Sequence, residues 1–275
     1  MRIDLLFLSC NRLHYLKHSI PALLADPTEE FALTIWDNAS TDGSREFLEA
    51  VKDPRIVKKV LSPENVPPRL VLNQALEESS ADLFGLVADD LLVTPGWSRI
   101  LGTAHAEVPE FGRISCWHFA REEYDGQRAR HKMQTFGRHQ ILRHPWTNGC
   151  GLSKLKAMRD VGLVRPGEAE NDYWTRVALR GYVNGFYYPL VLVEHMDYPW
   201  SPHFAFADRF EEWLGQSSAA RHNGIRAMGD AQAWHRMVIR NLLDEPWQVE
   251  QYVGWRALLK RGRHRIHRML MHSRY

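Results

Sequence analysis

The chain has 275 residues, of which 44% are hydrophobic and 25% are charged, and its formal net charge is +2. This composition supplies enough apolar surface to bury a core, which excludes a disordered or fibrous protein. The longest apolar runs are about five residues, whereas a membrane-spanning helix needs roughly 20. The three cysteines are widely spaced and odd in number, which argues against a disulfide framework. We therefore expect a soluble, cytoplasmic protein.

The first hundred residues alternate apolar strands with amphipathic helices. The predicted strands cover 3–9, 31–37, 56–61 and 81–90, and the predicted helices cover 13–24, 44–51 and 69–78. Ser44 is the expected N-cap of the second helix. Strand–helix alternation with short links predicts an α/β fold, in which a mainly parallel sheet is flanked by helices on both faces.

Polar residues follow three of these strands, at the edge of the sheet where parallel α/β folds bind their ligands. The three groups are Ser9 with Asn11 and Arg12, Asp37 with Asn38, and Asp89 with Asp90. Because the carboxyl ends of parallel strands share one edge, we expect these groups to lie near one another.

Asp89 and Asp90 stand between two apolar runs in LFGLVADDLLV. A carboxylate in such surroundings is costly to bury unless it is paired, hydrogen-bonded or bound to a cation. Two adjacent carboxylates suit a hard divalent ion that shares its remaining ligands with a phosphate. The alternative is an ordinary turn with an Asp helix cap, because the turn signal TPGW follows closely.

The segment WDNASTDGS carries a second acidic turn, with Asp37 at the end of a strand and Asp42 before Gly43. A carboxylate in the position of Asp37 can accept a hydrogen bond from a base or from a ribose hydroxyl. The alternative is that Asn38, Ser40 and Asp42 only form local turns into the next helix.

WDNASTDGS, followed about fifty residues later by FGLVADDLLVTPGW, resembles the nucleotide-sugar half of family 2 glycosyltransferases with the GT-A fold. The resemblance implies that Asp37 contacts the nucleotide base. It implies that Asp90 is the main ligand of a divalent ion, Mn²⁺ or Mg²⁺, and that Asp89 supports it or contacts the ribose. The sequence departs from the motif at Ala88, where an acid is common.

Further parts of the chain resemble the same family. Arg69 and Asn73 lie four residues apart on one predicted helix face and are implied contacts of the nucleotide sugar. The turn at residues 147–149 resembles a stretch that lines the sugar and acceptor side. YYPLVLVEHMD (187–197) is predicted as one strand ending in His195, which the resemblance implies as a second metal ligand. A neutral imidazole is a suitable ligand for Mn²⁺. The alternative is chance, because a chain with 14 histidines can have one at the end of a strand without a function.

ENDYWTRVALRGY (170–182) predicts a helix that opens with two acids, Glu170 and Asp172. Carboxylates are stabilised at a helix N-terminus by the helix dipole, so capping is one explanation. The family's catalytic base lies in an acidic motif that opens a helix ending in Arg and a Gly-aromatic pair. The resemblance therefore implies Glu170 or Asp172 as the base, and the sequence leaves both open.

Together the resemblances imply an inverting transfer of sugar from a UDP- or dTDP-type donor to an acceptor hydroxyl on a glycan, a lipid-linked acceptor or a surface polysaccharide. They imply a GT-A catalytic domain over 1–197, with a nucleotide-sugar half (1–100) and an acceptor half (101–197). Residues 198–275 are expected to form a helical extension. Its tryptophans either stack on a sugar ring or close a helical core.

The last 25 residues carry a charge of +7, while the preceding 250 carry −5. Apolar residues there recur at spacings of three, four and seven, which predicts an amphipathic helix with a basic surface. Residues 255–275 could attach the protein to the anionic inner face of a membrane, contact nucleic acid, or pack on their own domain. The alternative functions are a GT-A-like binding module without catalysis and a basic-tailed protein that binds or acts on nucleic acid, which is not favoured.

Overall fold

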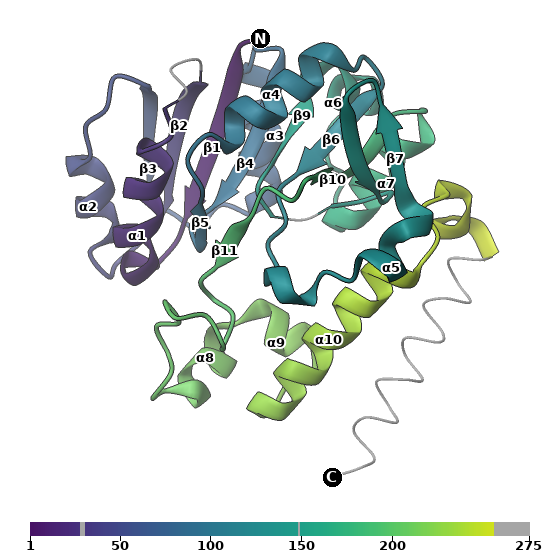
Figure 1. Ribbon diagram of the computed structural model, residues 1–275. Coiled ribbons are helices and arrows are strands. Elements are labelled where there is room, and N and C mark those ends of the chain that lie inside the picture. Colours follow the sequence, from purple (N-terminus) through teal and green to yellow (C-terminus); the bar gives the residue numbers. More distant parts are fainter. Residues whose placement is uncertain (28–30, 148, 256–275) are drawn as a thin grey trace.

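A computed structural model describes residues 1–27, 31–147 and 149–255. The amino-terminal half is a parallel α/β unit, as predicted (Figure 1). Its strands are β1 (Ile3–Ser9), β2 (Phe31–Asn38), β3 (Ile56–Ser62) and β4 (Leu83–Ala88). Its helices are α1 (Leu13–Leu24), α2 (Ser44–Ala50), α3 (Pro68–Glu78) and α4 (Trp97–Glu107).

The second half extends the same sheet and makes it mixed. Its strands are β6 (Phe111–Ser115), β7 (Met133–Phe136), β8 (His139–Arg143), β9 (Gly151–Lys154) and β10 (Val183–Tyr188). The nine strands lie in the order β3-β2-β1-β4-β9-β6-β10-β8-β7. β9 runs antiparallel between β4 and β6, and so joins the two halves. The helices here are α5 (Gly126–Ala129), α6 (Leu155–Val161) and α7 (Glu170–Leu179).

Both faces of the sheet are buried, because successive side chains of a strand point to opposite faces. On β1, Leu5 and Phe7 pack in one apolar cluster with α1 and α4, whereas Leu6 packs in a second cluster with α3, α6 and α7. Burial on both sides fixes the strand register, and with it the positions of the loops at the carboxyl ends.

Two local predictions are wrong. Residues 187–197 are not one strand: β10 ends at Tyr188, the chain turns at Pro189, and β11 (Val193–His195) pairs with β5 (Leu91–Val93) in a separate two-stranded sheet. Proline has no N–H to donate and so does not continue an inner strand. Ser44 is not the N-cap of α2: Gly43 takes that position with a φ of 91°, and Asp42 accepts a hydrogen bond from the Ser44 N–H.

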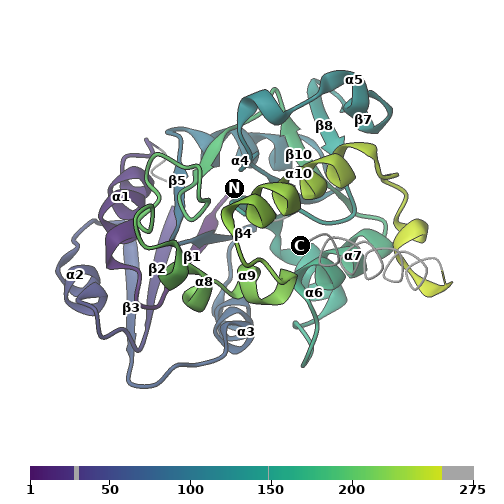
Figure 2. The same cartoon turned by 90° about the horizontal axis from the view of Figure 1, so that it is seen from below.

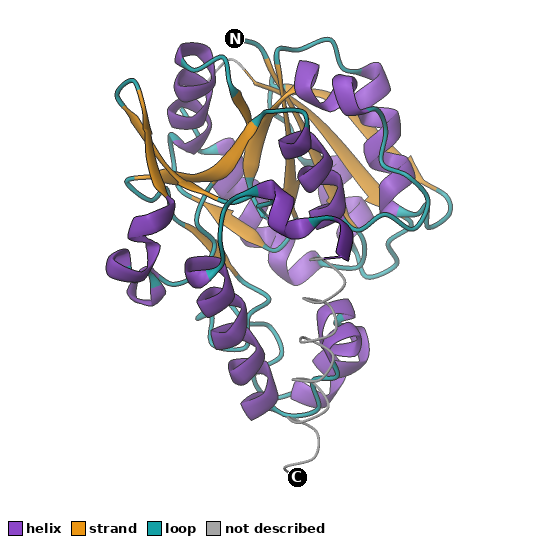
Figure 3. Ribbon diagram, turned by 90° about the vertical axis from the view of Figure 1, so that its right-hand side faces the viewer, coloured by secondary structure: helices purple, strands orange, loops and turns teal. Residues whose placement is uncertain are grey.

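The carboxyl-terminal segment adds helices below the carboxyl ends of the strands, as Figures 2 and 3 show. They are α8 (Phe210–Gln216), α9 (Ser218–Asn223) and α10 (Met228–Asp244), followed by a 3₁₀ turn at Val249–Tyr252. Two further 3₁₀ turns, Arg121–Glu123 and Arg130–Lys132, lie between β6 and β7 in the second half. α10 buries Ile239, Leu242 and Leu243 against Trp117 and Phe186 of the second half.

Across the described part of the chain, no helix combines the length and apolarity that a membrane crossing requires. The predicted basic helix falls almost entirely on 256–275, outside the described residues. The domain boundary at residue 197 stays a prediction.

Candidate active site

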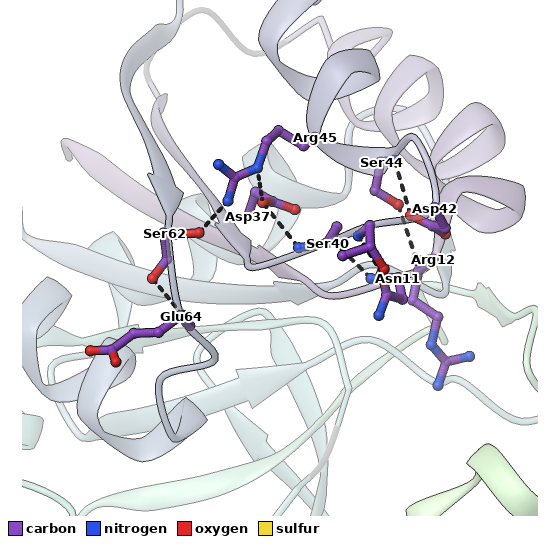
Figure 4. Close-up of polar contacts among 10 residues, drawn as sticks. Asn11, Arg12, Asp37, Ser40, Asp42, Ser44, Arg45, Ser62 and Glu64 are labelled. Carbon is purple, nitrogen blue, oxygen red and sulfur yellow. Dashed lines mark hydrogen bonds and ion pairs between the residues drawn. The ribbon is translucent and has the colours of Figure 1, made fainter.

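The loops after β1 and β2 lie side by side, because Ser9 is directly opposite Asp37 in the parallel register. The backbone N–H of Asn11 donates to the Ser40 hydroxyl (2.9 Å), and the Asn11 side-chain oxygen accepts from the Thr41 N–H (2.7 Å; Figure 4). Asn11 has a φ of 54°, in the left-handed region that Asn tolerates better than most residues. The Asn11 side chain therefore holds this rim together.

Asp37 lies at the end of β2, as predicted, and its side chain is fully buried. One carboxylate oxygen pairs with Arg45 Nε at 3.1 Å and accepts from the Ser40 N–H (Figure 4). The other oxygen, Oδ1, is buried and has no hydrogen-bond partner among the described residues. Asp37 thus has one anchored oxygen and one buried oxygen without a partner among the described residues.

Two predicted nucleotide-sugar contacts already have structural roles. The Asn38 amide bonds the side chain of Asn65 and both backbone polar groups of Val66. The Asn73 amide is buried and makes the same pair of backbone bonds to Val164. Arg69 is half-buried at the start of α3. Contacts of Asn38 and Asn73 with a nucleotide sugar stay predictions, but both amides are used in holding loops in place.

The two predicted metal ligands are brought together by the small β5–β11 sheet. Asp90 is separated from β4 by Asp89 and directly precedes β5, and the antiparallel register places His195 opposite Leu91. The Met196 N–H donates to the Asp90 carbonyl oxygen at 2.8 Å, which fixes the two segments side by side. Asp90 and His195 line the same cavity.

Each of these two side chains has one atom of a kind that can bind a divalent cation. Asp90 Oδ1 and His195 Nδ1 are both buried and have no hydrogen-bond partner in the described residues. Carboxylate oxygen and imidazole nitrogen are ligands that Mn²⁺ accepts. No group of three or more His, Cys, Asp or Glu side chains within the described residues could hold a metal ion. A cation held by Asp90 and His195 would therefore need further ligands from a substrate or water.

Burial and neighbouring charges shift the pKa values of two groups beside this site, Asp89 and Arg12. Burial, and then repulsion from Asp90, raises the pKa of Asp89 to about 7. Burial disfavours the charged form of Arg12 and by itself would lower its pKa. The negative charges of Asp197, Asp89 and Asp90 have the larger combined effect, so the pKa of the guanidinium is raised. Arg12 is thus the cation that partly balances an acidic cluster.

Asp197 links the sheet to the helical extension. Its carboxylate pairs with Arg12 at 3.2 Å and accepts from the Tyr15 hydroxyl at 2.8 Å and from the Trp213 indole N–H at 3.1 Å. Tyr15 belongs to α1 and Trp213 to α8. The predicted nucleotide-sugar half and the extension are therefore tied through one nearly buried carboxylate.

The cavity has a volume of about 320 Å³ and lies between the strand ends and α8–α10. Glu170, at the start of α7, lines it together with Asp90 and His195. The Glu170 carboxylate is exposed and accepts from the Trp174 indole N–H at 3.1 Å. Asp172 is also exposed but does not line this cavity. Of the two acids that the sequence leaves open, only Glu170 faces the metal-binding candidates.

A buried arginine supports this wall of the cavity. The Arg113 guanidinium donates to the carbonyl oxygens of Thr147 (3.2 Å) and Gly149 (2.7 Å) and lies 4.4 Å from the centre of the Trp174 ring. Burial lowers its pKa, and the nearby Glu170 carboxylate opposes that shift. Arg113 therefore holds the carbonyl groups of Thr147 and Gly149 and lies against the indole that holds Glu170.

Sequence reasoning missed several cavity residues. His118 lines the cavity, and burial lowers its pKa to about 3, so its imidazole is neutral. His118 comes shortly after the apolar strand β6. A histidine at the end of an apolar strand was also the signal for His195, but no family motif in this sequence includes His118. Tyr198 also lines the cavity, in a segment with no such motif. Trp200, one of the tryptophans that the sequence offered for stacking on a sugar ring, lines it as well.

An α/β sheet with acids at its strand ends and a cavity beside them is the arrangement expected of the GT-A fold. The sequence model described as "Glycosyl transferase family 2" matches residues 6–159, more than half of the chain, so the protein belongs to that family. A search of curated proteins gives no match.

Solved structures with this fold include three that carry a nucleotide or nucleotide sugar. The mannosyltransferase PcManGT from Pyrobaculum calidifontis, in complex with GDP-Man and Mn²⁺, is 18% identical (TM-score 0.58; 88% of this chain, 70% of that chain). S. aureus TarS 1-349 with UDP-GlcNAc is 14% identical (0.54; 92% and 93%). GalNAc-T7 with UDP, GalNAc and Mn²⁺ is 13% identical (0.57; 71% and 44%). At these identities the likeness concerns the fold, and it confirms the predicted GT-A architecture.

Proposed function

We propose that the protein transfers a sugar from a nucleotide diphosphate sugar to an acceptor hydroxyl, with inversion at the anomeric carbon. The donor is of the UDP or dTDP type, and the acceptor is a glycan, a lipid-linked acceptor or a surface polysaccharide. One observation carries the proposal: Asp90, His195 and Glu170, from three distant segments, line one cavity at the carboxyl end of the sheet.

The donor would occupy the rim formed by the loops after β1, β2 and β4. Asp37 offers a buried oxygen without a partner, which suits an N–H of the base. Arg12 lies close enough to Asp89 and Asp90 to be perturbed by both, and its guanidinium suits a diphosphate. Ser9 is buried at the end of β1 and Asp89 follows β4, so both belong to the same rim.

Asp90 and His195 would hold a divalent ion, Mn²⁺ or Mg²⁺, with diphosphate oxygens completing its coordination. When bound, the ion supplies positive charge that stabilises the leaving diphosphate. Support comes from the two unpartnered ligand atoms and from Mn²⁺ in the structures of PcManGT and GalNAc-T7.

Glu170 would act as the general base. Its carboxylate takes the proton from the acceptor hydroxyl as that oxygen bonds to the anomeric carbon and the bond from that carbon to the diphosphate breaks. Attack from the face opposite the diphosphate inverts the anomeric centre. Trp174 orients the carboxylate through its indole N–H. Asp172 stays the alternative base, and an inactive binding module is the alternative in which both acids are structural.

The first test is thermal unfolding with UDP, dTDP or GDP, each with and without Mn²⁺ or Mg²⁺. A ligand that binds only the folded state at 100 times its Kd stabilises it by about 2.7 kcal/mol, so a clear rise in Tm is expected. The second test is release of the nucleoside diphosphate from UDP-, dTDP- and GDP-sugars without an acceptor. No shift and no release with any of them would refute the transferase. Attachment to membranes through 255–275 stays a prediction.

A further inference from the structure

A continuous stack of rings leads from the candidate metal ligand to the mouth of the cavity. The His195 imidazole stacks on Tyr198 with ring centres 4.1 Å apart and an interplanar angle of 11°. Tyr198 in turn stacks on Trp200 at 5.2 Å and 24°. All three side chains line the cavity that also contains Glu170. The stack therefore runs from the site of the proposed chemistry outward.

Neighbouring rings hold this stack rigid. His235 of α10 packs edge-on against Trp200 at 4.2 Å and against Tyr198 at 4.8 Å. The His235 ring is itself fixed, because its Nε2 bonds the Glu123 carboxylate at 2.8 Å. Phe119 lies parallel to Tyr198 at 6.4 Å on the side of the acceptor half. A surface held in this way is preorganised, which lowers the entropic cost of binding to it.

The Trp200 side chain is more exposed to solvent than a tryptophan that packs in the core. Trp213 also lines the cavity but is 5% exposed and packs in the apolar cluster of α8–α10, whereas Trp200 is 36% exposed. An exposed indole beside carboxylates forms a surface that is apolar on one side and polar on the other. Binding sites of this mixed character fix a ligand by apolar area and orient it by a few polar groups. A pyranose ring matches it, because its C–H face is apolar and its hydroxyl groups are polar.

The aromatic stack lies on the side of the cavity where we expect the acceptor, and not on the side of the donor. The candidate donor residues lie at the ends of β1, β2 and β4, whereas α10 packs on Trp117 and Phe186 of the second half. Phe119, which touches Tyr198, follows β6 in that same half. A ring resting on Trp200 would thus approach Glu170 from the side of the extension, with the donor rim on the other side.

We propose that Trp200, backed by the Tyr198 ring, forms a stacking platform for a sugar ring of a carbohydrate acceptor and that this platform presents an acceptor hydroxyl to Glu170. The inference rests on the proposed glycosyltransferase function and adds to it a binding subsite with its ligand class. It also gives a function to one of the tryptophans in 198–255.

The test uses the full chain, the donor that it hydrolyses fastest, and a panel of methyl glycosides of common hexoses and N-acetylhexosamines as acceptors. Trp200→Ala is expected to raise the acceptor KM about five- to tenfold, the size of a lost ring contact, with a change under about twofold in the donor KM. Trp200→Phe, which keeps a stacking face, is expected to restore most of the acceptor affinity. Trp255→Ala is the matched control, because Trp255 is 65% exposed and does not line the cavity.

The outcomes separate the two proposals. If no nucleotide raises the Tm of the unmodified protein and no donor is hydrolysed, the transferase is refuted, and the platform with it. Donor hydrolysis without use of any glycoside in the panel overturns the platform alone. The platform is also overturned if Trp200→Ala and the unmodified protein have equal acceptor KM values. It is overturned as well if the acceptor KM of Trp200→Phe is as high as that of Trp200→Ala. Circular dichroism and Tm of each variant show whether a loss reflects misfolding.

Discussion

The rim formed by the loops after β1 and β2 and the cavity beneath β4 stand in contrast, although both lie at the same edge of the sheet. On the rim, most polar groups bond one another: Asn11 to Ser40 and Thr41, and Asp42 to the N–H groups of Leu13 and Ser44. In the cavity, one side-chain atom each of Asp90, His118 and His195 is buried with no hydrogen-bond partner among the described residues.

Buried polar atoms without partners cost free energy. Most polar groups of the rim therefore stabilise the fold, although Ser9 Oγ and Asp37 Oδ1 are also buried there without a partner among the described residues. The cavity differs because its unpartnered atoms belong to candidate ligands of a substrate or metal, whose partners would arrive with a ligand. The contrast predicts that substitutions on the rim act first on stability and that those in the cavity act first on activity.

The largest effect is expected for the base. Glu170→Gln keeps an oxygen that can accept from Trp174 but removes the proton acceptor, so turnover should fall about 10²- to 10⁴-fold. Asp172→Asn is the matched variant and should change turnover far less, because Asp172 does not line the cavity. Steady-state kinetics with donor and acceptor measure both. A reversed order would make Asp172 the base.

Asp90→Asn compared with Asp37→Asn tests the contrast directly. Asp90→Asn should lower donor hydrolysis about 10²- to 10³-fold, a typical loss for one electrostatic contact to the transition state, without lowering the stability of the ligand-free protein. Asp37→Asn should instead lower the free energy of unfolding by about 1–3 kcal/mol, because the Arg45 guanidinium loses its charged partner. Urea unfolding and metal-dependent hydrolysis measure the two effects. If Asp90→Asn were the variant that unfolds, the acid would be structural.

Arg113→Met tests whether the wall behind Glu170 depends on a buried cation. The carbonyl oxygens of Thr147 and Gly149 lose their donor, so the free energy of unfolding should fall by about 2–4 kcal/mol. Arg138→Met is the control: Arg138 is 69% exposed and pairs with Glu107, and an exposed pair contributes at most about 1 kcal/mol. Equal unfolding midpoints for the two variants would contradict the supporting role.

The smallest effect concerns Glu168, which anchors the loop before α7. Burial raises the pKa of this carboxyl, but hydrogen bonds from the Arg176 side chain and the Arg165 N–H outweigh burial and hold the pKa below its usual value. A depressed pKa stabilises the protein above the unfolded-state pKa, and that stabilisation is lost as the pH falls through the folded-state value. Glu168→Gln should therefore cost about 1–2 kcal/mol at pH 7.

The difference between Glu168→Gln and the unmodified protein should shrink as the pH falls below the unfolded-state pKa of about 4.3, and it should disappear only below the lower folded-state pKa. Urea unfolding at pH 7, 5 and 3.5 measures it. A difference that is constant with pH would mean that the side chain acts by packing and not by charge.

Much of the first half followed from local sequence. β1, β2 and β4 are short apolar runs bounded by polar residues, and α1 and α3 have a helical period, so neighbouring residues alone indicate the elements. The placement of Asp37 and of Asp89 with Asp90 at strand ends followed from the same pattern. The match to the family and the GT-A fold confirmed the recognition that these motifs carried.

Tertiary structure decided what depends on distant segments. The Asn38 and Asn73 amides turn out to hold loops, because Val66 and Val164 offer both backbone groups to them. Residues 187–197 divide into two strands, and only the pairing of β11 with β5 brings His195 to Asp90. Residues two apart on a helix do not share a face, so packing decided that Glu170 and not Asp172 lines the cavity. Local propensity depends on adjacent residues, whereas a site depends on contacts between segments whose register only the folded chain establishes.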